Sequence, residues 1–202
     1  MDLSSAYLDF LKILESFPGL EPQMKLLEIG GGYGCLASVF LRVTKCSYWL
    51  VDIPPSLYLS QEYLSQLFPD RKIFKFRHFE RFDDIQADLL DSDICFLTPN
   101  QLEMLPDRAV NIGLNINGFG DMTAEQVKNY SAIFQRICSV GVYLRNTVNA
   151  ASQAESYSRT LNDMKWTSPS TEDYLLKNTN LIRFRGHELE DGYSEIAYRT
   201  SP

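Results

Sequence analysis

The sequence predicts one α/β domain with a Rossmann-like, mostly parallel and doubly wound sheet, helices on both faces and a C-terminal antiparallel hairpin. The first observation is that short apolar runs alternate with segments of helical periodicity along most of the chain. The second is that several of these runs are continuously apolar, as in strands buried on both faces. The third is that the last strand-like runs flank a turn containing Asp191-Gly192, which is a hairpin signal.

The length of 202 residues suits a single domain with one well-buried core. We expect residues 1–24 to form a short helix and connector, and residues 25–202 to form the core. Apolar residues make up 45% of the chain and charged residues 22%, which is ordinary for a soluble globular protein.

The first half of the chain is expected to alternate helices with strands. Leu3, Tyr7, Phe10 and Leu14 recur at helical spacing, and Pro-Gly at 18–19 ends that helix. The elements expected next are a strand at 24–29, a helix at 33–43, a strand at 47–53 and a helix at 54–68. Proline opens the last of these helices, at a position where its missing N–H does no harm.

The second half continues this alternation. Basic and apolar residues alternate at 71–76, which predicts an edge strand, and two buried strands are expected at 93–99 and 109–117. Thr123 and Gln126 have capping-box spacing at the start of a helix over 123–138. A strand at 140–148, a polar loop or weak helix at 149–171 and two strands within 180–200 complete the expected order.

Charge and cysteine usage exclude several classes of protein. A net charge of −7 argues against a general nucleic-acid binder or a binder of anionic membranes. The four cysteines form no C-x-x-C pair, which suits a reducing cytoplasm, and two histidines are too few to predict a metal site. No positively charged start followed by an apolar run is present, and no apolar run approaches 18 residues, so we expect a protein of the cytoplasm.

The stretch "LLEIGGGYGCLA" at 26–37 is the clearest functional motif. It places a strand, a glycine turn and a helix in succession, with the spacing Glu28-x-Gly30-x-Gly32-x-Gly34. Open α/β sheets bind ligands beyond the carboxyl ends of their strands, next to the first strand. The motif therefore predicts a ligand site at this turn.

Three ligands compete for the glycine turn. A phosphate-binding P-loop needs a lysine that this turn lacks, and a nicotinamide fingerprint needs Gly or Ala where Cys35 stands. The nicotinamide interpretation stays open as the weaker alternative. S-adenosylmethionine fits better, because Glu28 can hold its amino group and Asp52, at the end of the second strand, can accept both ribose hydroxyls. Ile53, beside Asp52, belongs to the same predicted site.

The segment "LLEIGGGYG" resembles motif I of class I S-adenosylmethionine-dependent methyltransferases. From about residue 25 to 146, the chain is also similar to a family of sugar O-methyltransferases. The segments that carry this similarity are "VDIPPSLYLSQEYLSQLFP", "FLTPNQLEMLPD" and "NINGFGDMTAEQVKNY". The chain departs from the family pattern at Asp121, where the family has Glu before Met, and at Asn111, where an Asp often stands and a structural role is expected.

The resemblance implies further cofactor contacts. In "TPNQLEMLPD", Asn100 and Gln101 could hydrogen-bond adenine; an equally weighted alternative makes Asn100 only a helix N-cap. A different strand register would instead bring His78 near adenine. Asn115 or Asn117, in the turn after the fourth strand, is expected to contact the cofactor.

Catalysis would need a group that removes the proton of the acceptor hydroxyl. Asp121 is the first candidate by position, and His78 and His187 come next. The competing interpretation of Asp121 is a helix cap, because anions are stabilised at helix N-termini. Several tyrosines would suit stacking on a sugar, although aromatic residues at such spacings are more often core: Tyr33, Tyr58, Tyr63, Tyr143 and Tyr193.

Together these features predict an S-adenosylmethionine-dependent O-methyltransferase acting on a hydroxyl of a saccharide or similar small acceptor. The alternative from another class is a non-catalytic cofactor-binding subunit or scaffold, and a nicotinamide-dependent oxidoreductase ranks third. No nucleic-acid or membrane partner is expected, and a homo-oligomer is compatible with the sequence.

Overall fold

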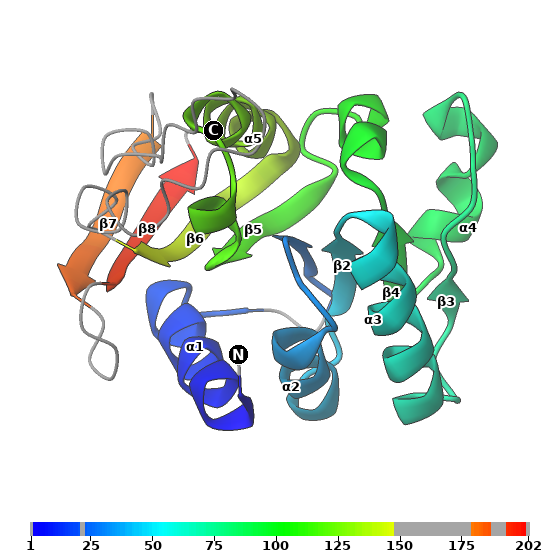
Figure 1. The fold of residues 1–202 in the computed structure, drawn as a ribbon, viewed down its shortest axis with the longest axis horizontal. Helices are drawn as coiled ribbons and strands as arrows, with labels where there is room; N and C mark the ends of the chain where they lie inside the picture. The colour runs from blue at the N-terminus through cyan, green and yellow to red at the C-terminus, as the bar shows by residue number, and fades with distance from the viewer. Residues whose placement is uncertain (1, 21–22, 148–178, 187–192, 201–202) are drawn as a thin grey trace, which may run out of the picture.

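The computed structural model describes residues 2–20, 23–147, 179–186 and 193–200 (Figure 1). Its sheet has the strand order β3-β4-β2-β1-β5-β6-β8-β7 among the described residues. These strands are β1 (Lys25–Ile29), β2 (Ser47–Val51), β3 (Ile73–Phe74), β4 (Ile94–Leu97), β5 (Val110–Ile116), β6 (Cys138–Thr147), β7 (Thr179–Gly186) and β8 (Tyr193–Thr200).

The pairing of the strands confirms the predicted fold class. All pairs from β3 to β6 are parallel, whereas β8 runs antiparallel to both β6 and β7. The chain order reverses at β1, which separates β2 on one side from β5 on the other. This reversal creates the switch point at which open α/β sheets bind ligands.

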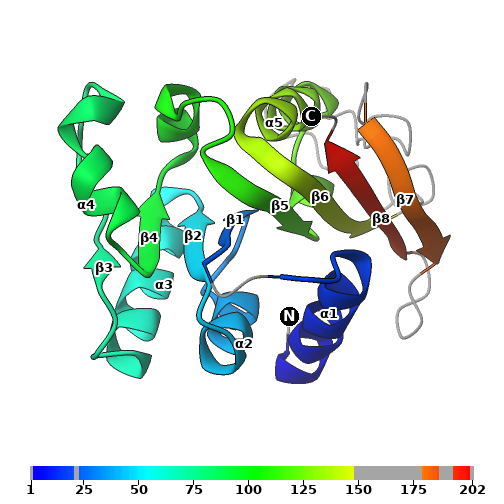
Figure 2. The ribbon, with the colours of Figure 1, turned by 180° about the vertical axis from the view of Figure 1, so that it is seen from behind.

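Helices cover both faces of the sheet. They are α1 (Leu3–Ser16), α2 (Cys35–Val43), α3 (Pro54–Leu67), α4 (Gln86–Leu90) and α5 (Ala124–Ile137). Figures 1 and 2 show α1, α2 and α3 together on one side and α5 on the other. Among the described residues, three short 3₁₀ helices lie in the loops: η1 (Phe82–Asp84), η2 (Pro99–Met104) and η3 (Gly118–Asp121).

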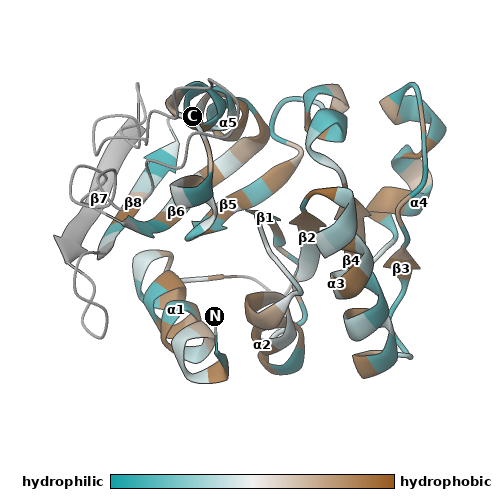
Figure 3. Ribbon diagram, viewed as in Figure 1, coloured by the Kyte–Doolittle hydropathy of each residue, from teal (hydrophilic) through white to brown (hydrophobic). Residues whose placement is uncertain are grey.

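Two apolar cores lie on the two faces of the sheet. Leu27 and Ile29 of β1 belong to the core under α5, whereas Leu26 belongs to the core under α1 and α2. This division follows from the two-residue side-chain period of a strand. Figure 3 shows apolar residues on β2 and β4 and mixed hydropathy on α5, as expected for strands buried on both faces and a helix buried on one.

Several predicted elements need correction. The helix at the start of the chain is confirmed, but Leu3 and Tyr7 of the predicted apolar stripe are mostly exposed, and Ala6, Phe10 and Ile13 form the buried face. The predicted edge strand is confirmed at the sheet edge with only two residues. Helix α4 was not predicted, because five residues are too few to show a helical period.

Three predictions fall outside the described residues: the polar stretch at 149–171, the hairpin turn at 191–192, and His187. Within the described part of the chain, no helix is both long and apolar enough to cross a membrane.

Candidate ligand-binding site

A cavity of about 380 Å³ opens at the carboxyl ends of β1 and β2, beside η2, η3 and the first half of α5. This is the switch point of the sheet, where the reversal of strand order at β1 leaves a crevice. Its lining residues are Ile29, Gly30, Gly32, Val51, Asp52, Ile53, Ser56, Pro99, Gly118, Asp121, Met122, Gln126 and Tyr130.

The glycine turn forms one wall of this cavity with backbone alone. Gly30, Gly32 and Gly34 all have positive φ angles, of 77°, 56° and 93°, which side chains other than hydrogen rarely allow. A Cβ atom added at Gly32 would meet no atom within 4 Å, whereas one at Gly34 would lie 2.9 Å from Leu64. Gly34 is therefore needed for packing against α3, and Gly32 leaves open space beside the cavity.

Asp52 joins the two strand ends. Its Oδ2 accepts a hydrogen bond from the Gly32 N–H at 2.7 Å, and its Oδ1 accepts one from the Ile53 N–H at 2.7 Å. Partial burial raises the pKa of Asp52, and these two N–H groups oppose the rise. A carboxylate has about four acceptor positions, so both oxygens can accept further bonds from a ligand.

Glu28 lies beneath the turn and does not line the cavity. It is 1% exposed, and its Oε2 accepts a hydrogen bond from the Tyr48 hydroxyl at 2.7 Å. The same oxygen is 3.0 Å from the position that a Cβ on Gly31 would take. Burial raises the pKa of Glu28 to about 7, with smaller contributions from the charges of Asp9 and Asp52, and the bond from Tyr48 opposes the rise.

Asn115 holds the neighbouring loop against the glycine turn. Its Nδ2 donates to the Ile29 carbonyl at 2.7 Å, and its Oδ1 accepts from the Phe119 N–H at 3.1 Å and from Asn146 Nδ2 at 3.0 Å. The side chain is fully buried and does not reach the cavity. Asn115, itself on β5, is therefore hydrogen-bonded to β1, to η3 and to β6.

Two glycine backbones meet where these loops touch. A Cβ added at Gly118 would lie 2.7 Å from Asn115 Nδ2 and 3.3 Å from the Gly30 Cα. Any side chain at Gly118 would push the two cavity walls apart. Asn117, just before it, has a left-handed φ of 62° and donates its N–H to the Arg145 carbonyl at 2.7 Å.

The 3₁₀ helix η2, which follows β4, has Thr98 and not Asn100 as its N-cap. This corrects the predicted cap position. Thr98 and Gln101 form a capping box at the start of η2. Gln101 is 3% exposed, and its Nε2 donates to the Arg77 carbonyl at 2.9 Å. Asn100 is exposed and its Oδ1 accepts from the Thr98 hydroxyl at 2.7 Å. Pro99 is the residue of this loop that lines the cavity.

The strand order also shows which segment is the neighbour of β2, and so which of the two loops considered for contact with adenine lies beside Asp52. β4 pairs with β2, so the loop that begins at Thr98 lies next to Asp52. The segment at 71–76 forms β3 at the outer edge of the sheet, one strand farther away. His78, which follows β3, is exposed and does not line the cavity.

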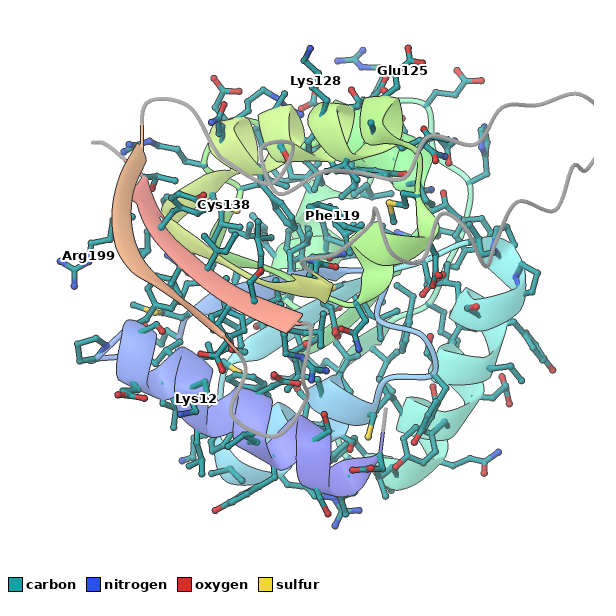
Figure 4. The ribbon with its side chains drawn as sticks, turned by 60° about the vertical axis from the view of Figure 1, so that its left-hand side comes forward. Lys12, Phe119, Glu125, Lys128, Cys138 and Arg199 are labelled. Carbon is teal, nitrogen blue, oxygen red and sulfur yellow. The ribbon has the colours of Figure 1, made fainter. Side chains whose placement is uncertain are left out.

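A further part of the cavity wall comes from η3 and α5. Gln126 and Tyr130 are four residues apart and thus on one face of α5, and both line the cavity with Met122. The Tyr130 ring stacks on Phe119 with centroids 6.4 Å apart, and Figure 4 shows Phe119 inside the molecule beneath α5. Burial, followed by the charge of Asp52, raises the pKa of Tyr130.

Sequence reasoning did not assign these three residues, or Ser56 and Pro99, to the site. When a helix follows a strand of the sheet, its first turns lie near the crevice at the strand ends. The four-residue spacing of Gln126 and Tyr130, which puts both side chains on one face of α5, was the signal available in the sequence. By contrast, Glu125 and Lys128 of the same helix point away from the sheet in Figure 4.

The structure thus brings Gly30, Gly32, Asp52, Ile53 and Asp121 together around one cavity. Asp121 is exposed at the rim, at the end of η3. The other predicted site residues do not line it: Glu28, Gly34, His78, Asn100, Gln101 and Asn115. The roles assigned to both groups in ligand binding and catalysis stay predictions.

Comparisons with known proteins agree on the fold. No protein-family model and no curated protein matches the sequence. Magnesium protoporphyrin IX methyltransferase from Synechocystis PCC 6803, with bound S-adenosylhomocysteine, superimposes with a TM-score of 0.69 at 9% identity, covering 98% of this chain and 83% of that one.

Two other solved structures show the same similarity. A geranyl diphosphate methyltransferase in complex with S-adenosylmethionine gives a TM-score of 0.64 at 12% identity over 98% of this chain and 85% of that one. Human N-acetylserotonin methyltransferase, also in complex with S-adenosylmethionine, gives 0.59 at 14% identity over 99% and 54%. The chain therefore has a Rossmann-like methyltransferase fold, as the sequence resemblance implied.

Proposed function

We propose that this protein is an S-adenosylmethionine-dependent methyltransferase. The observation that carries the proposal is that the Asp52 carboxylate and the open glycine turn line one cavity at the switch point of the sheet. The similarity to methyltransferase structures with bound S-adenosylmethionine or S-adenosylhomocysteine supports it. When bound, this cofactor supplies a methyl group on a positively charged sulfur.

The described residues fit the ribose and amino-acid portions of the cofactor. A volume of about 380 Å³ lies within the usual range of small-molecule pockets. Asp52 would accept hydrogen bonds from the two ribose hydroxyls through the acceptor positions left free by Gly32 and Ile53. Gly30 and Gly32 would let the amino-acid portion lie directly on backbone.

The purine would lie at the apolar end of the cavity. Ile53, Pro99, Met122 and Tyr130 all line the cavity. Apolar side chains around an aromatic ring stabilise it mainly by removing its surface from water. Gln101, whose amide is engaged by Thr98 and Arg77, is not part of this proposal.

The acceptor we propose is a hydroxyl of a sugar or a related small molecule. The similarity of residues 25–146 to sugar O-methyltransferases and the presence of Asp121 at the rim support this assignment. Asp121 would accept the hydroxyl proton while the acceptor oxygen forms its bond to the methyl carbon and the bond from that carbon to sulfur breaks. Alignment by the cavity walls would contribute much of the rate, because the displacement is in line.

Isothermal titration calorimetry with S-adenosylhomocysteine tests the cofactor assignment. The unmodified protein should bind, and Asp52→Ala should weaken binding roughly 10- to 100-fold, as expected for loss of hydrogen bonds to a charged group. Asp83→Ala, at an exposed position in η1, is the matched control and should bind as the unmodified protein does. Failure of the unmodified protein to bind would overturn the proposal, and stronger binding of NADH would favour an oxidoreductase.

The second candidate function is a cofactor-binding subunit without catalysis. It is favoured by one observation: among the described residues that line the cavity, Asp121 is the only carboxylate besides Asp52, and it is exposed. Methyl transfer from labelled S-adenosylmethionine to a panel of saccharides separates the two functions. Methylated product excludes the non-catalytic role, whereas cofactor binding without any product supports it.

A further inference from the structure

Glu28 lies within electrostatic reach of the cavity, although its side chain does not line it. Gly30, which does line the cavity, follows Glu28 by two residues, so their Cα atoms lie at most about 7 Å apart. This spacing is shorter than the Debye length of ~8 Å at physiological salt, and buried charges are screened less than exposed ones. A charge placed in the cavity therefore acts on the Glu28 carboxyl group.

The surroundings of Glu28 favour the neutral form of its carboxyl group. The residues opposite it on β2 and β5 are Leu50 and Leu114, which are both fully buried. Its Oε2 accepts from the Tyr48 hydroxyl, and Glu28 takes part in none of the ion pairs formed by the described residues. A buried carboxyl group without an ion-pair partner resists ionisation, because burial penalises the charged form.

Two other carboxylates act on Glu28 from neighbouring elements. Asp9 acts from α1, where it is paired with Arg145 of β6, which in turn lies opposite Glu195 of β8. Asp52 acts from the end of β2. Burial is the main cause that raises the pKa of Glu28 to about 7, and the charges of Asp9 and Asp52 add to the rise. Since Asp52 lines the cavity, a charge at the cavity wall already changes how tightly Glu28 holds its proton.

A positive charge in the cavity must have the opposite effect. It favours the ionised form of Glu28, and by linkage the ionised carboxylate strengthens the binding of the positive charge by the same factor. S-adenosylmethionine carries a positive charge on its sulfur, whereas the sulfur of S-adenosylhomocysteine, the product of methyl transfer, is neutral. The two ligands thus differ in the one property to which Glu28 responds.

We propose that Glu28 is the residue through which this site distinguishes the charged cofactor from its product, by holding a proton in the empty site and releasing it to solvent when the positive sulfur is bound. Once the methyl group has been transferred, the sulfur is neutral, so Glu28 takes up a proton again and the extra affinity is lost. Glu28 therefore favours exchange of product for fresh cofactor. This inference rests on the proposed function.

Isothermal titration calorimetry of the full chain at pH 7, in two buffers with different ionisation enthalpies, counts the protons released. We expect up to about half a proton per S-adenosylmethionine bound, because a group with a pKa of about 7 is half protonated at that pH. S-adenosylhomocysteine should release fewer. Glu28→Gln, which cannot ionise, should abolish the difference between the two ligands.

The pH dependence of the two affinities gives a second measurement. In the unmodified protein, the affinity for S-adenosylmethionine relative to S-adenosylhomocysteine should rise roughly tenfold from pH 5.5 to 7.5, as Glu28 loses its proton. In Glu28→Gln this ratio should not change with pH. Glu80→Gln, the same substitution at an exposed position, is the matched control and should follow the unmodified protein.

Tyr48→Phe separates a proton on Glu28 from a merely structural role. The Tyr48 hydroxyl lowers the pKa of Glu28, so its loss should move the midpoint of the pH profile to higher pH. An unmoved midpoint would assign the proton to another group and overturn the proposal. Binding of both ligands without proton release, or with a ratio independent of pH, would also overturn it and leave the proposed function standing. Failure of both ligands to bind would overturn the proposed function as well.

Discussion

At the scale of single residues, glycines and carboxylates near the β1–β2 end have different tasks that their spacing alone does not reveal. Gly32 borders open space, Gly34 makes room for Leu64, and Gly118 makes room for Asn115. Asp52 faces the cavity, whereas Glu28 lies under the turn with Tyr48. Similar residue types at this end of the sheet thus border the cavity, make room for packing or lie buried beneath the turn.

Replacing either of two glycines by alanine should separate packing from binding. Gly118→Ala forces a Cβ to within 2.7 Å of Asn115 Nδ2, so we expect a loss of about 1–3 kcal/mol in unfolding free energy. Gly32→Ala meets no neighbour but places a methyl group toward the cavity at a positive φ, so stability should fall by roughly 1–2 kcal/mol and S-adenosylhomocysteine binding should be lost. Urea unfolding and calorimetry measure the two effects. Unchanged ligand affinity in Gly32→Ala would contradict this view of the turn.

Glu28 should make the stability of the fold depend on pH. Because its pKa is raised from 4.5 to about 7, the folded state holds the proton more tightly than the unfolded state. Stability contributed by the neutral form is therefore complete below pH 4.5, falls as the pH rises toward 7, and is lost above it. Glu28→Gln removes this dependence and should be more stable than the unmodified protein by roughly 3 kcal/mol at pH 8, but not at pH 4.

Urea unfolding at several pH values from 4 to 8 checks this prediction. Glu80→Gln, at an exposed position, is the matched control and should track the unmodified protein. Parallel stability curves for Glu28→Gln and the unmodified protein would show that Glu28 titrates normally.

At the scale of elements, local sequence signals determine where a helix begins, whereas tertiary contacts determine which of its faces is buried. The capping box of Thr123 and Gln126 was readable from four residues, and the structure confirms it at the start of α5. The predicted structural role of Asn111 is also confirmed, because its Oδ1 accepts the Lys25 N–H at 2.8 Å and its Nδ2 donates to the Ser139 hydroxyl. The buried face of α1 was mispredicted because it includes Asp9, a charged residue that no apolar pattern would place inside.

Asp9 should contribute strongly to holding α1 on the sheet. Its Oδ1 lies 3.1 Å from Arg145 Nε of β6, and both side chains are fully buried. Removing one partner of a buried ion pair costs about 3–5 kcal/mol, because the other charge stays buried. We expect Asp9→Ala to lose stability in that range by urea unfolding.

Asp2→Ala provides the comparison for Asp9→Ala on the same helix. Asp2 caps α1 by accepting the Ser5 N–H at 2.8 Å, and loss of such a cap costs about 1 kcal/mol. Equal losses from the two variants would show that the buried pair adds nothing beyond an ordinary cap.

At the scale of the whole molecule, the strand order converts separate motifs into one site. Because β1, β2, β4 and β5 are parallel, the turns after them lie at one end of the sheet, and the reversal of strand order at β1 opens a crevice between them. Residues as distant as Gly30 and Tyr130 therefore share a cavity.

The sequence alone determined the fold class, most element positions, the glycine turn and the carboxylate at the end of β2. These follow from local periodicity, backbone conformation and the rule that parallel strands end at one edge, all of which are readable from neighbouring residues. Only the tertiary structure decided that Glu28 and Asn115 are buried, that Thr98 is the cap, and that Met122, Gln126 and Tyr130 complete the cavity. Those outcomes depend on which side chains meet across the sheet, and packing between residues far apart in the chain leaves no local pattern.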